Sequence, residues 1–197
     1  MCIDAAAVNL RRPSGFTLVE LVMYIVIVSV AIVGILAVLD ITAKSSADPL
    51  IRKQMLAIAE GLLEEVEMQP FTYCDPSDAN ATTATGTAAC ATLVQGLGAA
   101  NGETRLSADN PFNNVADYFA AGGYPLASPI LDITGGNPAP AGYSATIQIV
   151  PEALNGIASS SAPAGMDVLR IAVTVSHGGD ALTLEGYRTR HSPNFTP

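Results

Sequence analysis

The chain has 197 residues, of which 18 are acidic and nine are basic, so its formal net charge is −9. This excess of acid, without a cluster of lysines and arginines, excludes recognition of nucleic acid through the phosphate backbone. Charged residues make up only 14% of the chain and tryptophan is absent, while alanine, glycine, threonine and proline are abundant, which fits a loop-rich exported head.

Residues 1–15 are predicted to form a cytoplasmic leader. Arg11 and Arg12 are its basic residues, and Pro13-Ser14-Gly15 ends it as a helix breaker. Basic residues before an apolar run keep that end of the chain inside the cell.

Two other export signals are alternatives. A secretory signal is cut after its apolar core, but residues 33–40 offer no clean small-x-small site. A twin-arginine signal fits the two arginines superficially, but the long apolar span with an embedded acid argues against it.

The apolar segment runs from Phe16 to Leu39 and contains one charged residue, Glu20. Its 24 residues reach about 36 Å as a helix, enough to cross the hydrocarbon core of a bilayer. A carboxylate inside such a helix costs about 2.5–3.5 kcal/mol on insertion scales and usually has a partner charge. The sequence therefore predicts one membrane helix whose acid needs a partner.

The helix is predicted to continue beyond the membrane as an amphipathic segment that ends at Gln69-Pro70. Its apolar residues fall on one stripe: Ile51, Met55, Ile58, Leu62 and Val66. Its acidic residues fall largely off that stripe: Glu60, Glu64, Glu65 and Glu67. Pro49 removes one backbone hydrogen bond, so a kink or local melting is expected near Ala47.

Two of the three cysteines are expected to form a disulfide. Cys2 leaves with the leader, whereas Cys74 and Cys90 remain in the exported part and enclose fifteen residues poor in apolar side chains. A bridge over that loop is worth roughly 3 kcal/mol in the loop-entropy model. Two free thiols or a metal pair are the alternatives, but the chain's two histidines, His177 and His191, lie far away in the sequence.

Residues 71–137 are predicted to be loops and short elements. Asp75, Asp78 and Asn80 resemble half of a calcium loop, but the glycine and the distal glutamate of that motif are missing. Capping of turns by these side chains is the favoured interpretation.

The last third of the chain is predicted to be a three-stranded meander. Residues 143–150 and 169–175 alternate apolar and polar side chains with the period of a strand. Gly178-Gly179 permits a tight turn, and residues 181–190 return as a third strand through Leu182, Leu184 and Tyr187.

The sequence Gly15-Phe16-Thr17-Leu18-Val19-Glu20 resembles the class III signal of type IV pilins and pseudopilins. The resemblance implies cleavage by prepilin peptidase between Gly15 and Phe16 and N-methylation of Phe16. It also implies that Glu20 forms the assembly salt bridge with the N-terminal ammonium of a neighbouring subunit. The amine exposed by cleavage is positive at neutral pH and attracts a carboxylate strongly in a low-dielectric setting.

The same resemblance implies an α+β pilin fold, with a long bent helix packed on an antiparallel sheet. It divides the chain into a cleaved leader (1–15), a transmembrane and assembly helix (16–68) and a periplasmic globular head (69–197). The implied protein is a single-pass inner-membrane subunit that later joins a pilus on the cell surface. Its implied partners are the peptidase and N-methyltransferase, the major and minor pilins that pack along its N-terminal helix, and the inner-membrane assembly platform. No cofactor or metal is expected.

Later stretches are similar to minor pilins of the mannose-sensitive haemagglutinin pilus: 59–66, 70–76, 114–118, 168–171 and 186–190. A pseudopilin of a type II secretion system would share the leader, Glu20 and the bent helix, and remains the alternative. A tip adhesin is a third possibility, although no loop identifies a ligand. The sequence contains no Gly-x-Ser-x-Gly, His-Glu-x-x-His or phosphate-loop motif, so an enzyme is not expected.

Overall fold

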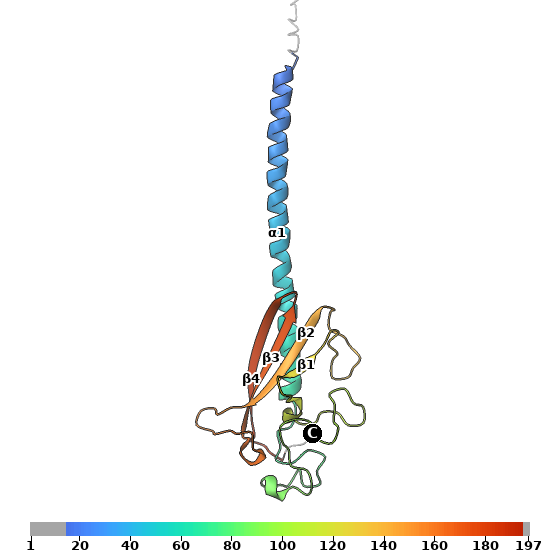
Figure 1. The fold of residues 1–197 in the computed structure, drawn as a ribbon, viewed down its shortest axis with the longest axis vertical. Helices are drawn as coiled ribbons and strands as arrows, with labels where there is room; N and C mark the ends of the chain where they lie inside the picture. The colour runs from blue at the N-terminus through green and yellow to red at the C-terminus, as the bar shows by residue number, and fades with distance from the viewer. Residues whose placement is uncertain (1–14, 195–197) are drawn as a thin grey trace, which may run out of the picture. The chain divides into compact units, whose positions relative to one another are not determined.

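The computed structural model describes residues 15–194, with the backbone alone for residues 41–48. The described residues form one long α-helix, a four-stranded sheet and three short 3-10 helices (Figure 1). The helix is α1 (Leu18–Glu67), and the strands are β1 (Tyr124–Leu126), β2 (Tyr143–Pro151), β3 (Val168–His177) and β4 (Asp180–Thr189). The 3-10 helices are η1 (Thr87–Ala89), η2 (Val115–Tyr118) and η3 (Pro163–Gly165). The α+β class predicted from the sequence is confirmed.

The chain divides into two compact units, Met1–Asp48 and Pro49–Pro197. The described part of the first unit is helical from Leu18 onward, and its side chains up to Asp40 are exposed apart from the half-buried Val28. The leader lies outside the described residues except for Gly15. Helical backbone continues through Ala47 and Pro49, so the predicted local melting is wrong, while the kink stays a prediction. Proline removes only one hydrogen bond of the helix, and the neighbouring turns are kept.

The sheet of the second unit is an antiparallel meander in the order β1-β2-β3-β4. Tyr143 of β2 pairs with His177 of β3, which in turn pairs with Asp180 of β4 across the predicted Gly178-Gly179 turn. The three predicted strands are therefore confirmed. The short strand β1 adds a fourth, with Tyr124 paired to Ile147.

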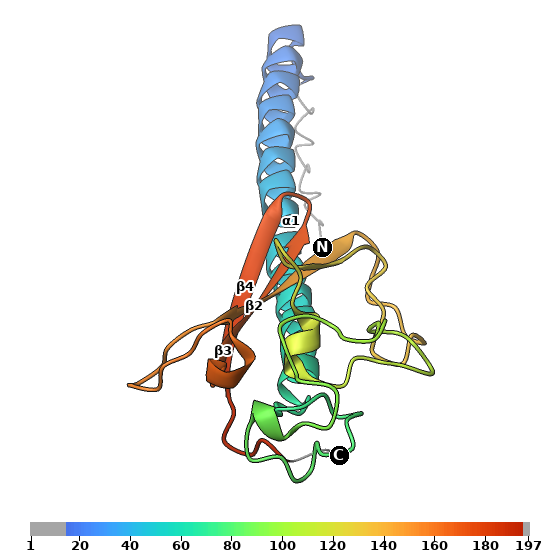
Figure 2. The ribbon, with the colours of Figure 1, turned by 60° about the horizontal axis from the view of Figure 1, so that its bottom comes forward.

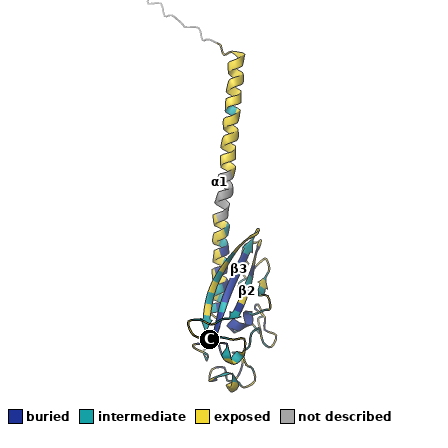
Figure 3. Ribbon diagram, turned by 60° about the vertical axis from the view of Figure 1, so that its left-hand side comes forward, coloured by how far each residue is buried: buried dark blue, intermediate teal, exposed yellow. Residues whose placement is uncertain are grey.

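The core of the second unit lies between the second half of α1 and one face of the sheet (Figure 2). Buried residues alternate with more exposed ones along β2, whereas most of β3 is buried; Figure 3 colours the strands by burial. The buried helix residues are Met55, Ala59, Leu62 and Val66, and the buried strand residues include Tyr143, Ile147, Ile149, Leu169, Ile171 and Val173. Burial of each large apolar side chain stabilises the fold by about 1.5–3 kcal/mol. The predicted apolar stripe is confirmed.

One side chain of the third predicted strand lies on the other face. Leu182 and Leu184 pack against the core, but Tyr187 is exposed, and its hydroxyl donates to Glu152 at 3.2 Å. The alternation of the strand puts Gly186, not Tyr187, on the helix side. A Cβ added to Gly186 would meet the Glu67 carboxylate and Leu63, so glycine permits the close approach of helix and strand.

The irregular segment after α1 is held by covalent and polar ties. Cys74 and Cys90 form the predicted disulfide, with 5.5 Å between their Cα atoms. The Asp78 carboxylate accepts backbone N–H groups of Ala91, Thr92 and Leu93 at 2.7–3.0 Å and thereby ties both sides of the loop together. These bonds, that of Leu93 foremost, lower the pKa of Asp78. Turn capping is thus the observed role of this residue. The described residues contain no group of three or more His, Cys, Asp or Glu side chains suited to a metal ion.

A second polar cluster surrounds η2 and contains two buried acids. Asp117 accepts the N–H groups of Asn113 and Asn114 at 2.9 and 2.7 Å, and the Gln95 side chain donates to it at 3.0 Å. Burial raises the pKa of Asp117 to about 6. Burial and the nearby charges of Asp117 and Asp75 raise the pKa of Glu103 to about 7.

These two acids should make the second unit more stable at mildly acidic pH than at alkaline pH. Both pKa values lie above those of the unfolded chain, so the folded state binds protons more tightly. The resulting stabilisation is present at low pH and is lost as the pH rises through about 6 for Asp117 and about 7 for Glu103. Thermal unfolding of the detergent-solubilised chain between pH 5 and pH 8.5, followed by near-ultraviolet circular dichroism, measures the effect.

Glu103→Gln is the control, because glutamine imitates the protonated acid and keeps an acceptor for the Ala100 N–H group. The variant should show a smaller change of melting temperature between pH 6 and pH 8. An equal change in both proteins would contradict the assignment of Glu103.

Candidate functional site

The candidate site is the segment from Gly15 to Glu20, at the start of α1. Gly15, Phe16 and Thr17 precede the first helical residue, and the Phe16 side chain is 84% exposed. No atom lies within 4 Å of the position that a Cβ on Gly15 would take. The peptide bond between Gly15 and Phe16 therefore lies in exposed, non-helical backbone, which is the state that a peptidase requires.

Thr17 fixes the start of the helix. Its hydroxyl oxygen accepts the Glu20 N–H group at 3.3 Å, and its carbonyl oxygen accepts the Leu21 N–H group at 3.1 Å. This is the N-cap position of a helix, and Thr17-x-x-Glu20 has the spacing of a capping box. The cap holds Glu20 in the first turn, where the positive end of the helix dipole favours a carboxylate. Within residues 15–194 the structure gives this carboxylate no hydrogen-bond or ion-pair partner.

The helix that follows the site is long and apolar enough to cross a membrane. Leu18–Asp40 comprises 23 residues with a mean hydropathy of 3.0, and none of these residues is buried inside the protein. The Ser29 hydroxyl donates to the Ile25 carbonyl at 2.7 Å. This bond satisfies a polar group that would otherwise be costly in lipid.

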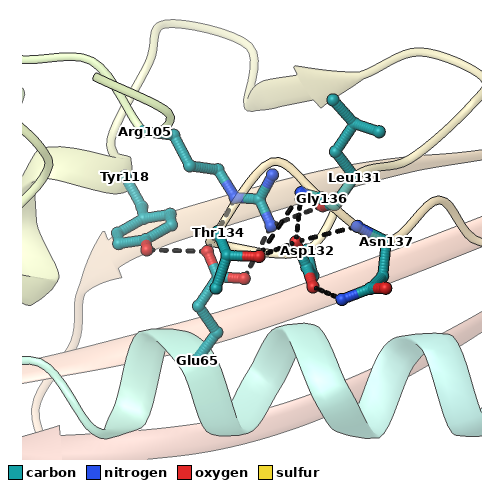
Figure 4. Close-up of polar contacts among 8 residues, drawn as sticks. All are labelled: Glu65, Arg105, Tyr118, Leu131, Asp132, Thr134, Gly136 and Asn137. Atoms are coloured by element: carbon teal, nitrogen blue, oxygen red, sulfur yellow. Dashed lines mark hydrogen bonds and ion pairs between the residues drawn. The ribbon is translucent and has the colours of Figure 1, made fainter. Parts of the chain in front are cut away.

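A charged clamp in the second unit joins α1 to two loops (Figure 4). Arg105 Nε and Nη2 each donate to a carboxylate oxygen of Glu65 at 2.6 Å, and Arg105 Nη2 also donates to the Leu131 carbonyl at 2.9 Å. The Tyr118 hydroxyl donates to Glu65 at 2.8 Å. The Arg105 and Glu65 side chains are only 2% and 10% exposed. Burial, and then the charge of Glu65, raise the pKa of Tyr118.

The sequence did not predict this clamp. Glu65 was assigned to the acidic face of α1, and Arg105 lies 40 residues away in a loop without any periodic pattern. The only available signal was a single basic residue, Arg105, in a loop region, and this signal does not indicate which acid the arginine pairs with.

A loop beside the clamp borders a shallow groove along α1. Asp132 closes this loop by accepting from Thr134, Gly136 and Asn137 at 2.7–3.0 Å, as Figure 4 shows. The groove has mainly apolar walls: Ala57, Ile58, Gly61, Leu62, Ile130 and Ala139. Of the charged residues that line the groove, Arg105 and Glu65 are paired with each other and Asp132 is bonded within its own loop, so the arrangement is that of a structural tie.

Removal of Arg105 should destabilise the second unit strongly. Arg105→Leu leaves the buried Glu65 carboxylate without its cation, and breaking a buried pair in this way costs about 3–5 kcal/mol. Chemical denaturation of the detergent-solubilised chain measures the loss. Arg170→Leu is the matched control, because Arg170 binds Glu152 and Glu185 on the exposed face of the sheet and its loss should matter little. Equal effects of the two substitutions would contradict the role of the clamp.

Comparison with known proteins identifies one motif. Residues 10–38 match the model of the prokaryotic N-terminal methylation motif, which is the signal of type IV pilins and pseudopilins. No curated protein and no solved structure matches the chain. The motif implies processing by prepilin peptidase, and with the apolar helix it fits a single-pass protein anchored in the inner membrane. The motif, the long N-terminal helix and the antiparallel sheet together support a type IV pilin-like or pseudopilin subunit, a structural component rather than an enzyme.

Proposed function

We propose that the chain is a minor pilin-type subunit that is inserted in the inner membrane and takes part in assembly of a type IV pilus involved in adhesion. Prepilin peptidase removes residues 1–15 and methylates Phe16, residues 16–68 form the transmembrane and assembly helix, and residues 69–197 form the periplasmic head. The observation that carries the proposal is the placement of Gly15, Phe16 and Glu20. An exposed cleavage bond lies four residues before an acid that has no partner among the described residues, at the start of a helix of membrane-spanning length.

The physical argument concerns the charge of Glu20. Cleavage after Gly15 creates an ammonium group at Phe16, which is the opposite charge that an acid in an apolar medium requires. The side chain lies one helical turn beyond that terminus, within a capped first turn. In one straight helix the Glu20 carboxylate does not pair with its own N-terminus and with that of a neighbour at once, so we assign the pairing to a neighbouring subunit. The other partners are the assembly platform and the pilins that pack along the helix.

Similarity to MshD, a minor pilin of the mannose-sensitive haemagglutinin pilus, supports the assignment of the chain to a minor pilin of an adhesion pilus of that kind. The similar stretches include residues 59–66 of α1 and residues 186–190 of β4. A type II secretion pseudopilin is the second candidate, favoured by the same methylation motif. Neighbouring genes for pilus components or for secretion components separate the two.

The mature protein should begin at Phe16 and carry one added methyl group. Intact-mass measurement of protein from the membrane fraction tests this, because a start after Leu39 would mean a conventional signal peptide and would contradict the proposal.

Gly15→Glu should block processing, because it places a bulky charge at the cleavage site. Gly15→Ala is its control, because it keeps a small residue at the same position. Neither variant is expected to disturb the second unit, because Gly15 has no neighbouring atoms within 4 Å of its added Cβ position.

Glu20→Ala should leave a processed, membrane-inserted protein with an intact Cys74–Cys90 bridge but should prevent its incorporation into filaments. The reason is loss of the charge that meets the neighbour's terminus in a low-dielectric medium. Co-purification of the variant with sheared filaments, at equal membrane abundance, is the measurement.

Glu20→Gln is the matched control, since it keeps the shape of the side chain and removes only the charge. Both variants should fail alike. Normal incorporation of either would refute pairing in trans and leave peptidase recognition as the role of Glu20.

A further inference from the structure

A small pocket opens in the second unit where the chain leaves α1 and where β4 ends. It has a volume of about 150 Å³, and none of the six residues that line it is acidic: Pro70, Phe71, Arg188, Thr189, His191 and Ser192. Pro70 and Phe71 are buried, whereas His191 and Ser192 are exposed. The pocket therefore combines an apolar floor with a polar rim that solvent reaches.

Basic side chains are concentrated at this end of β4. Arg188, Arg190 and His191 lie close together in the sequence of a chain that has only nine lysines and arginines against 18 acids. Arg105 and Arg170 each pair with a carboxylate, whereas Arg188 and Arg190 have no ion-pair partner among the described residues. Two neighbouring guanidinium groups thus have no counter-ion in the part of the chain that the structure describes, although acids are in excess.

Arg188 is held in the pocket wall by the backbone that follows α1. Its Nη2 donates to the Gln69 carbonyl at 3.2 Å. Its Nε is buried and has no hydrogen-bond partner among the described residues. A guanidinium group has five N–H donors in one plane, so a single bond to a carbonyl oxygen leaves most of its donors for a ligand. The bond to Gln69 therefore explains where the side chain lies but does not use up its capacity to bind.

Arg190 adds a fixed positive charge next to the pocket floor. Its guanidinium carbon lies 4.7 Å from the ring centre of Phe71 and 4.9 Å from that of Tyr73. Arg190 is only 8% exposed; its Nη1 donates to the Pro163 carbonyl at 2.9 Å, while its Nε and Nη2 have no partner among residues 15–194. Burial lowers the pKa of Arg190, as expected of a cation taken out of water. Because Phe71 also lines the pocket, an anion bound there would lie close to this charge.

We propose that this pocket binds the carboxylate group of a small organic acid. The planar fork of Arg188 matches the two oxygens of a carboxylate, and the Ser192 hydroxyl at the rim supplies a further donor. Pro70 and Phe71 offer apolar surface to the body of the acid. A carboxylate fits better than a doubly charged phosphate, because Arg190 is enclosed and only one guanidinium group belongs to the lining.

The inference goes beyond the proposed function and does not depend on it. All of its residues belong to the second unit, and neither the cleavage site nor the apolar half of α1 takes part. It would give the second unit a ligand class that the sequence pattern of the loops does not identify.

Nuclear magnetic resonance of the ¹⁵N-labelled full chain in detergent tests the site directly. Each arginine Nε–H group gives its own signal, so Arg188 is compared with Arg105 and Arg170, which already hold carboxylates. Benzoate is the probe, and benzamide, which has nearly the same shape without the charge, is the control. We expect benzoate to shift the Arg188 signal until the site is saturated, while the signals of Arg105 and Arg170 stay in place. Benzamide should bind about tenfold more weakly, the scale of one charge-assisted hydrogen bond.

Substitutions separate binding from folding. Arg188→Lys keeps the charge but removes the planar fork, so it should weaken benzoate binding about tenfold. Because Arg188 also bonds to Gln69, Ser192→Ala is a second variant at the exposed rim. It should keep the melting temperature and weaken benzoate binding about fivefold, the scale of one hydrogen bond. Arg170→Lys is the matched control, because it makes the same exchange at an arginine outside the pocket, and it should leave benzoate binding unchanged.

Three results would overturn the proposal: an Arg188 signal that does not move, equal binding of benzoate and benzamide, or full benzoate binding by both Arg188→Lys and Ser192→Ala. Inorganic phosphate is the competing anion, and its displacement of benzoate at a lower concentration than benzoate itself requires would also contradict a carboxylate site. None of these outcomes depends on cleavage after Gly15 or on Glu20, so failure of the pocket and failure of the proposed function are distinguished.

Discussion

The packing of one stripe of α1 on the inner face of the sheet is the constraint on which the second unit depends. Met55, Leu62 and Val66 fill the space over Ile147 and Ile171, and this contact fixes which side of the helix faces water. The first half of α1 has no such stripe, because its side chains are apolar on nearly every side. One helix therefore combines a segment suited to lipid with a segment suited to a protein core.

The loops beyond the helix cannot rely on the same force. The segment enclosed by Cys74 and Cys90 is made largely of alanine, threonine and asparagine, so little apolar area is available to order it. The disulfide and the Asp78 carboxylate order this segment instead, and the Arg105–Glu65 pair ties a later loop to α1. Such ties are specific in direction, which suits loops that must hold one conformation without a large core.

Elements with a short repeat were predictable from the sequence, and contacts between distant loops were not. The period of the helix stripe and of strands β2 and β3 is carried by consecutive residues, so sequence alone locates them. The clamp of Glu65 with Arg105 spans 40 residues, and no local pattern records such a pairing. At the candidate site, Gly15, Phe16 and Glu20 were identified by motif, whereas the cap provided by Thr17 appeared only in the structure.

The charge of Glu20 lies in a different medium from the charges on the surface of the second unit. Two unit charges at 4 Å attract by about 1 kcal/mol in water and by about 4 kcal/mol at an effective dielectric constant of 20. Salt screens an exposed pair such as Arg170 and Glu152, but it scarcely reaches a pair enclosed by apolar helices. Under the proposed function, Glu20 is therefore the charge suited to holding subunits together once its partner terminus is in place, because a pair in that medium survives the salt outside the cell.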